Sequence, residues 1–202
     1  MDIENRVITC QNHFKEDKVF EVPYDYLVMA NGAMTNTFNT PGVNFGENNV
    51  YFLKDLQHAR AIRNRILECF ERASYPNATT EEIDRLLTFV IVGGGPISVE
   101  FAGELHSFMK RDISKWYPEF QNRVNIQMIE AGQHILGPFN PSLVAYAEDL
   151  MAKNKMILRT GVAVREVRDH EVELQDGTVI PCGIVVWSTG VKPTRFISTL
   201  KE

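Results

Sequence analysis

The residues with the clearest chemical potential are Gly93, Gly94 and Gly95, which follow an apolar run over residues 87–92 and precede a segment opening at Pro96. This order is typical of a buried strand that ends in a tight turn and continues as a helix. Gly95 would let a pyrophosphate approach the backbone, and the helix would direct its free N–H groups and positive dipole end at the phosphates. The pattern predicts a dinucleotide-binding turn.

The third position of this glycine fingerprint departs from the usual pattern. Gly93 and Gly95 hold the first two places, whereas Ser98 stands where glycine or alanine packs the helix closely against the strand. Serine is only slightly larger than alanine, so we expect the turn to survive with a tighter fit. Glycine clusters also mark ordinary turns. The preceding strand and the apolar spacing of Val99, Ala102 and Leu105 favour the nucleotide interpretation.

A second requirement of such a site is an acidic residue at the end of the next strand, where it can accept hydrogen bonds from ribose hydroxyls. Glu130 closes the apolar run over residues 124–129 and meets this requirement. Its separation from Gly93 exceeds the roughly 20 residues of a minimal unit, and a longer helix with an added connection over residues 106–123 would explain the excess. The alternative is a solvated acid at a strand end. If Glu130 binds ribose, it disfavours a 2′-phosphate and selects NADH over NADPH.

Composition narrows the remaining possibilities. The chain has 202 residues, 44% of them hydrophobic, and a net charge of −5 with scattered Lys and Arg, which argues against nucleic acid. Three widely separated cysteines form no C-x-x-C pair. The five histidines show no metal-ligand spacing, so no metal is predicted; they are His13, His58, His106, His134 and His170. No apolar run reaches the roughly 18 residues of a transmembrane helix.

Hydrophobic periodicity predicts the elements around these residues. Short strands are expected at residues 6–10 and 18–22, forming a hairpin or meander, and a buried strand at residues 24–33 running into a glycine turn at Gly32. A helix is expected over residues 55–73, with Thr79 as a cap before the next.

After Glu130, residues 141–156 suit a helix with Leu143, Ala147, Leu150 and Met151 on one face. A three-stranded meander follows, with a hairpin turn at Asp176-Gly177, and a buried strand over residues 183–190 ends at Gly190. These repeated strand–glycine endings predict an α/β fold.

Several segments together resemble the type II NADH dehydrogenases, the single-chain, non-proton-pumping NADH:quinone oxidoreductases. The similarity covers nearly the whole chain, and its densest parts are residues 33–43, 52–54, 67–73, 92–106, 117–118, 129–132 and 186–193. In that family two Rossmann-like domains bind FAD and NADH, the NADH domain being inserted within the FAD domain. Hydride passes from nicotinamide to flavin, and electrons continue to a membrane quinone.

The resemblance implies a domain plan. Residues 1–54 would be part of an FAD-type domain, residues 55–190 a Rossmann-like NADH-binding domain with its lead-in helix and β-meander, and residues 191–202 the return to the FAD-type domain. It also implies a peripheral place at the mitochondrial inner membrane, with a possible homo-oligomer or larger assembly.

The resemblance further implies residue roles. Gly93, Gly94, Gly95 and Pro96 would form the NADH pyrophosphate turn, with Glu130 on the ribose. Glu100 would act near the nicotinamide from the first turn of the helix, the alternative being ordinary stabilisation of the helix dipole. Gly190 and Val191 would border the nicotinamide where the chain returns, and Gly32 and Ala33 would lie at the first crossing. Both glycine turns could also merely end strands.

A full family member also has an initial FAD glycine turn, a Gly-Asp FAD motif, quinone-site residues and amphipathic membrane helices, none of which is recognised here. We therefore expect this chain alone to bind FAD poorly, with the missing segments or a partner chain supplying the rest. Two hypotheses follow. The chain is the NADH-binding part of a working NADH:quinone oxidoreductase, which is preferred, or it is a truncated, non-catalytic nucleotide-binding or structural subunit. A ferredoxin or disulfide reductase is disfavoured because no redox dithiol is present.

Overall fold

The computed structural model describes residues 1–12 and 15–200, so His13 and the last two residues of the predicted C-terminal segment lie outside it. Its chain forms two compact units, residues 1–33 with 193–202 and residues 34–192. The predicted boundaries at 54 and 190 stay a prediction. The compact units divide the chain elsewhere because β4 (Val50–Phe52) pairs in parallel with β11 (Ile184–Trp187) inside the second unit.

The second unit is built on a five-stranded parallel sheet of order β4-β11-β5-β6-β7. Its central strand β5 (Thr88–Val92) is fully buried, which explains its unbroken apolar sequence. The other strands are β6 (Asn125–Ile129) and β7 (Ile157–Arg159). The predicted α/β class is thus confirmed, as are the predicted strands before the glycine turn and before Glu130.

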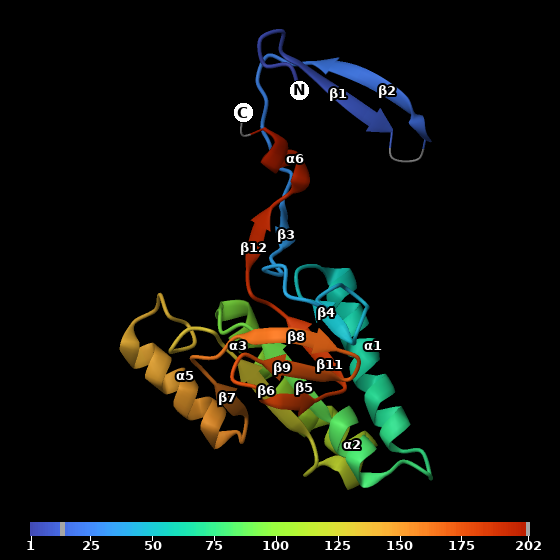
Figure 1. Cartoon of the computed structure of the whole chain (residues 1–202), viewed down its shortest axis with the longest axis vertical. Helices are drawn as coiled ribbons and strands as arrows, with labels where there is room; N and C mark the ends of the chain where they lie inside the picture. Colours follow the sequence, from blue (N-terminus) through green and yellow to red (C-terminus); the bar gives the residue numbers. More distant parts are fainter. Residues whose placement is uncertain (13–14, 201–202) are drawn as a thin grey trace. The chain divides into compact units, whose positions relative to one another are not determined.

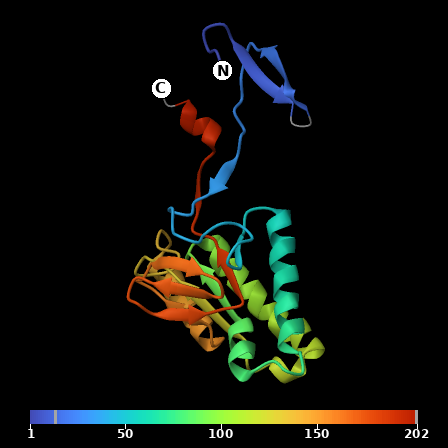
Figure 2. The same cartoon turned by 45° about the vertical axis from the view of Figure 1, so that its right-hand side comes forward.

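Helices cover one face of this sheet (Figure 1, Figure 2). The predicted helix over residues 55–73 is α1 (Leu56–Ala73), which Asp55 caps by accepting the N–H of His58. Thr79 caps α2 (Thr80–Leu86) in the same way, as predicted. The helix after the glycine turn is α3 (Pro96–Phe108).

The long connection between α3 and β6 contains three short helical segments. A π-helix, η1 (Met109–Ile113), and two short turns, α4 (Ser114–Trp116) and η2 (Pro118–Phe120), extend α3. Tyr117 stacks on Phe70 of α1 with ring centroids 5.3 Å apart. The additional residues therefore pack into the helical layer and leave the end of β6 in place, as expected.

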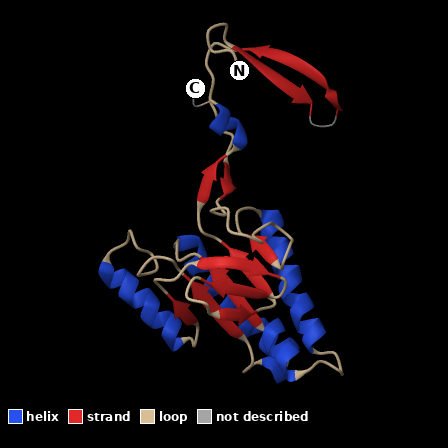
Figure 3. Cartoon of the chain, in the orientation of Figure 1, coloured by secondary structure: helices blue, strands red, loops and turns tan. Residues whose placement is uncertain are grey.

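The other face of the sheet carries the predicted meander, an antiparallel sheet of order β10-β9-β8 (Figure 3). Its strands are β8 (Val164–Arg168), β9 (Glu171–Leu174) and β10 (Val179–Pro181). Gly177, with φ +86°, makes the turn predicted at Asp176-Gly177.

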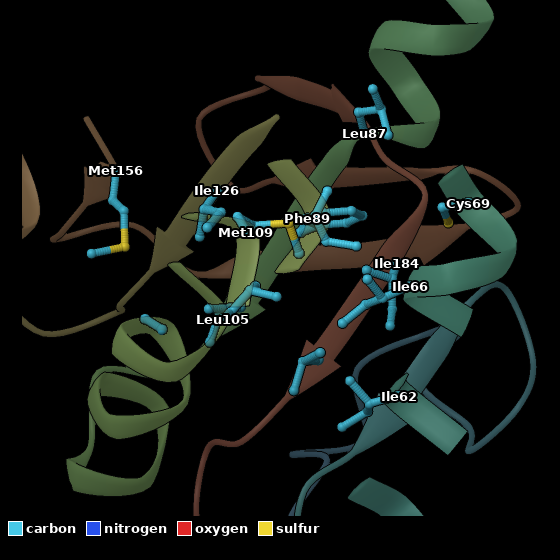
Figure 4. Packing of buried hydrophobic residues seen from close by; sticks show 14 of the residues in the cluster. Ile62, Ile66, Cys69, Leu87, Phe89, Leu105, Met109, Ile126, Met156 and Ile184 are labelled. Carbon is cyan, nitrogen blue, oxygen red and sulfur yellow. The ribbon is translucent and has the colours of Figure 1, made fainter. Parts of the chain in front are cut away.

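Alternation along the parallel strands divides the core between the two faces. Phe89, Ile126 and Ile184 point into the helical layer, where Figure 4 shows them with residues of α1 and α3. Val90 and Val185 point into the meander layer. The parallel sheet is thereby covered on both sides, as a sheet of this kind requires.

The helix after Glu130 buries a face that matches the predicted one only in part. It is α5 (Pro141–Lys153), and its buried positions are Val144 and Met151, whereas Leu143 and Leu150 are 54% and 44% exposed. The predicted face is thus half right: Met151 is buried and Ala147 packs against the core as predicted, whereas Leu143 and Leu150 are exposed because Val144 takes the contact position.

In the other unit, the predicted hairpin is present as β1 (Val7–Asn12) paired antiparallel with β2 (Lys15–Pro23). A five-residue helix, α6 (Arg195–Thr199), also belongs to this unit. The buried strand predicted at residues 24–33 was wrong. Tyr26 and Val28 are 95% and 86% exposed, because within the described residues no strand pairs with this stretch. Only its end, Ala33, enters a strand, β3 (Ala33–Thr35), which pairs with β12 (Val191–Pro193).

Candidate nucleotide-binding site

The glycine turn lies at the topological switch point of the parallel sheet. From β5 the chain proceeds outward to β6 and β7 on one side, and the later strand β11 pairs on the other side. Ligands of open α/β sheets bind at the carboxyl ends of the strands where the order reverses. Gly93 follows β5 and Ser188 follows β11, so these two residues mark that place.

The surroundings explain why glycine occupies each of the three positions of the turn, and they differ from one position to the next. Gly93 has φ +111°, and a Cβ built on it would lie 2.5 Å from the Ser188 carbonyl oxygen. A Cβ on Gly94 would lie 2.9 Å from the Glu130 side chain, whereas a Cβ on Gly95 would project into open space. Gly93 and Gly94 thus permit close packing, and Gly95 leaves its backbone approachable from the cavity.

Helix α3 opens onto this turn with uncapped N–H groups. Gly95 is its N-cap, Pro96 is its first residue, and no side chain caps it. Proline suits this position because its missing N–H would have no partner there. An anion at the turn would meet free backbone donors and the positive end of the helix dipole.

The Glu130 carboxylate closes the turn from the next strand. Oε2 accepts the N–H of Gly94 at 2.5 Å, and Oε1 accepts the N–H of Gly132 at 2.6 Å. Each carboxylate oxygen has two acceptor sites, so each keeps one for a further donor such as a hydroxyl. The two backbone bonds set the orientation of the carboxylate.

These elements enclose a cavity of about 780 Å³. Its lining includes most of the predicted site, namely Gly93, Gly94, Gly95, Pro96, Glu130, Gly190 and Val191. Lys54 and Arg165 are its cationic lining residues, and Arg165 donates to the buried Glu173 at 2.8 Å. Two cations, one anion and a glycine-rich turn suit a ligand that carries phosphates and hydroxyls.

Three predicted residues lie outside this lining. Glu100 is exposed and is the fifth residue of α3, beyond the first turn of the helix, so its predicted place in the first turn was wrong. Gly32, with φ +66°, and Ala33 precede the stretch that lines the cavity, which starts at Thr35.

The sequence prediction missed a group of hydrogen-bonding residues at the end of β11 and directly after it. Trp187 Nε1 and Thr189 Oγ1 both donate to the Asn36 carbonyl, at 3.0 and 2.7 Å, and the Asn36 N–H donates to the Gly190 carbonyl at 3.0 Å. The only available signal was the polar pair Ser188-Thr189 between a buried strand and a glycine. Asn36, the acceptor of Trp187 and Thr189, lies more than a hundred residues earlier, so local spacing could not reveal it.

Ser98 also has a specific partner. It is fully buried, and its Oγ donates to the Ser188 carbonyl at 3.1 Å. The hydroxyl therefore fits the close contact between α3 and the end of β11, and the departure from the fingerprint leaves the turn intact.

Within residues 1–12 and 15–200, no group of three or more His, Cys, Asp or Glu side chains could hold a metal ion. In the same part of the chain, no helix is both long and apolar enough to cross a membrane.

Comparison with known protein families identifies the class to which this fold and site belong. The model of the pyridine nucleotide-disulphide oxidoreductases matches residues 1–201, so the chain belongs to that family. The predicted architecture of a two-dinucleotide reductase is thereby confirmed.

Individual relatives lie within the type II NADH dehydrogenases, which confirms the resemblance. The external alternative NAD(P)H-ubiquinone oxidoreductase B4 of Arabidopsis thaliana mitochondria is 43% identical over 95% of this chain and 34% of its own length. The external NADH-ubiquinone oxidoreductase 2 of Saccharomyces cerevisiae mitochondria is 42% identical over 92% of this chain and 34% of its own length.

Among solved structures, NDH2 of Plasmodium falciparum in complex with NADH superposes with a TM-score of 0.89. It is 29% identical, over 96% of this chain and 40% of its own. The chain thus spans about a third of the length of the curated relatives it matches.

Proposed function

We propose that this chain is the NADH-binding part of a flavin-dependent NADH:quinone oxidoreductase. The observation that carries the proposal is the Glu130 carboxylate, which is bonded to the glycine turn and shares a cavity with the uncapped start of α3. The relatives are named as NADH or NAD(P)H-ubiquinone oxidoreductases, and one similar structure contains NADH. The flavin and quinone steps are proposed for the complete polypeptide.

The residues present fit NADH. The turn of Gly93, Gly94 and Gly95 with Pro96 would hold the pyrophosphate. Gly95 leaves its backbone approachable, and the uncapped first turn of α3 supplies free N–H groups, whereas the N–H groups of Gly93 and Gly94 are already bonded to the Ile129 carbonyl and to Glu130. The remaining acceptor sites of Glu130 would take the adenosine ribose hydroxyls, which favours NADH because a 2′-phosphate would meet a negative charge.

The nicotinamide would lie at the other end of the cavity. We assign Gly190 and Val191 to its border, since both line the cavity beside the end of β5. FAD supplies the two-electron acceptor when bound, and the protein's task is to hold the two rings together and exclude water. We keep the exposed Glu100 as a proposed residue near the nicotinamide, and Gly32 and Ala33 as the proposed place where the chain first crosses between the FAD-type and NADH-binding domains.

Peripheral attachment to the mitochondrial inner membrane is proposed as the location. Support comes from the relatives, which are named as mitochondrial proteins. Fractionation of mitochondria with alkaline extraction would test it, and recovery in the matrix fraction would overturn it.

Ligand titration of the purified chain tests the central proposal. NADH and ADP-ribose, which lacks the nicotinamide, should both bind, and NADPH should bind more weakly. A folded chain that binds none of them at millimolar concentration would refute the proposal. The complete polypeptide with FAD should then oxidise NADH with a soluble quinone. Binding without oxidation would instead support the non-catalytic nucleotide-binding subunit.

A further inference from the structure

The short segment 188–190, which leaves β11, is held on its first side by the glycine turn and α3. The Ser98 hydroxyl donates to the Ser188 carbonyl at 3.1 Å, and Ser98 has no exposed surface. The same carbonyl oxygen lies where a Cβ on Gly93 would be only 2.5 Å away. The Ser188 peptide therefore packs directly against the start of the proposed pyrophosphate site.

On its second side the segment is bonded to the backbone of Asn36. The Asn36 carbonyl accepts Thr189 Oγ1 at 2.7 Å and Trp187 Nε1 at 3.0 Å, and its N–H donates to the Gly190 carbonyl at 3.0 Å. Trp187 is 2% exposed, so its indole N–H needs this acceptor. The backbone of Asn36 thus makes three hydrogen bonds to residues 187–190.

These hydrogen bonds matter because Gly190 has no side chain whose packing could fix its backbone conformation. It has φ +110°, and a Cβ built on it would meet nothing within 4 Å. Glycine is also the most conformationally free residue. The direction of the chain at Gly190 and Val191, which line the cavity, must therefore come from the bonds on either side of it.

We propose that Ser98 and Thr189 are positioning residues that fix the nicotinamide end of the cavity relative to the pyrophosphate turn. The proposal rests on the proposed NADH site. It gives Ser98, the residue that departs from the glycine fingerprint, a role: its hydroxyl links the helix that receives the phosphates to the segment that borders the nicotinamide.

The comparison of NADH with ADP-ribose separates this role from a general structural one. Thr189→Val and Ser98→Ala each remove one hydroxyl, and a hydrogen bond of this kind contributes about 0.5–1.5 kcal/mol. We expect the Kd for NADH to rise about 3- to 10-fold in each variant, with less than about a 2-fold change for ADP-ribose. Thr189→Ser keeps a hydroxyl and should restore NADH binding.

Thr199→Val is a matched control. Thr199 Oγ1 donates to the Phe196 carbonyl at 2.7 Å, the same distance as the Thr189 bond, and the site is exposed and outside the cavity lining. Its affinities for both ligands should equal those of the wild type.

The outcomes distinguish failure of the positioning role from failure of the proposed NADH site. Equal weakening of NADH and ADP-ribose binding, or no weakening of either, in variants with wild-type circular dichroism would overturn the positioning role. Should Thr189→Val not fold, the change in the Kd for NADH relative to that for ADP-ribose in Ser98→Ala decides the positioning role. Absence of binding of both ligands to the wild type would reject the NADH site itself.

Discussion

Replacing Glu130 by Gln tests the ribose contact with a change of one atom and one charge. The carboxylate accepts backbone N–H groups on both oxygens, from Gly94 at 2.5 Å and from Gly132 at 2.6 Å. A glutamine side chain has one acceptor oxygen and one donor nitrogen, so it can satisfy only one of these N–H groups. The other bond is lost, and the orientation of the side chain is lost with it.

The size of the effect follows from the loss of a charged acceptor. Hydrogen bonds to charged groups contribute about 1.5–3 kcal/mol, which corresponds to a rise of about 10- to 100-fold in the Kd for NADH. For NADPH the change has the opposite sign, since a like charge near the 2′-phosphate disappears. At about 4 Å that repulsion is worth about 1 kcal/mol in water and about 4 kcal/mol near a protein surface. The preference for NADH over NADPH should therefore fall by at least about tenfold.

Fluorescence titration with NADH and NADPH measures both constants, with Glu104→Gln as the control. Glu104 carries the same carboxylate on α3 but is 75% exposed and pairs only loosely with Arg111, at 3.9 Å. The control should leave the coenzyme preference unchanged. If Glu130→Gln folds normally and also keeps the wild-type preference, the ribose assignment is refuted and Glu130 serves only to close the turn.

Three further predictions follow from the same geometry. Gly93→Ala should abolish NADH binding and lower the thermal midpoint, because its Cβ would meet the Ser188 carbonyl at 2.5 Å in a left-handed conformation; wild-type binding would contradict this. Gly103→Ala, an open helical position, should raise the free energy of unfolding by about 0.5–1 kcal/mol, measured by urea denaturation, and a loss would contradict it. Burial raises the pKa of Cys69 to about 11 and that of Cys182 to about 12, above the ordinary thiol value. Both thiols favour the native state while neutral, so stability should hold below about pH 9 and fall as pH rises through about 11; a flat profile over this range would contradict the burial argument.

The parts of the site that were predictable from sequence are those built by neighbours in the chain. The turn from β5 through Gly93 into α3 is a continuous segment, and its residues carry both the strand and the helix signals. Glu130 was predictable because it ends an apolar strand, and parallel strands bring their carboxyl ends together. The expectations that failed depend on what lies beside an element. Residues 24–32 have a strand's composition but no pairing strand in the described chain, and in α5 the buried face includes Val144 in place of Leu143.

The contact between Gly93 and Ser188 shows why a glycine fingerprint alone understates such a site. The fingerprint describes only the strand–turn–helix that receives the phosphates, whereas Gly93 is required here by a carbonyl from the end of another strand. That strand, β11, pairs directly with β5, so the two carboxyl ends are adjacent although they are distant in sequence. The hydroxyl of Ser98 bonds the same carbonyl, which makes serine at the third fingerprint position a link between segments rather than a defect. The geometry of the glycine turn therefore depends on Ser188, a residue that the local motif does not contain.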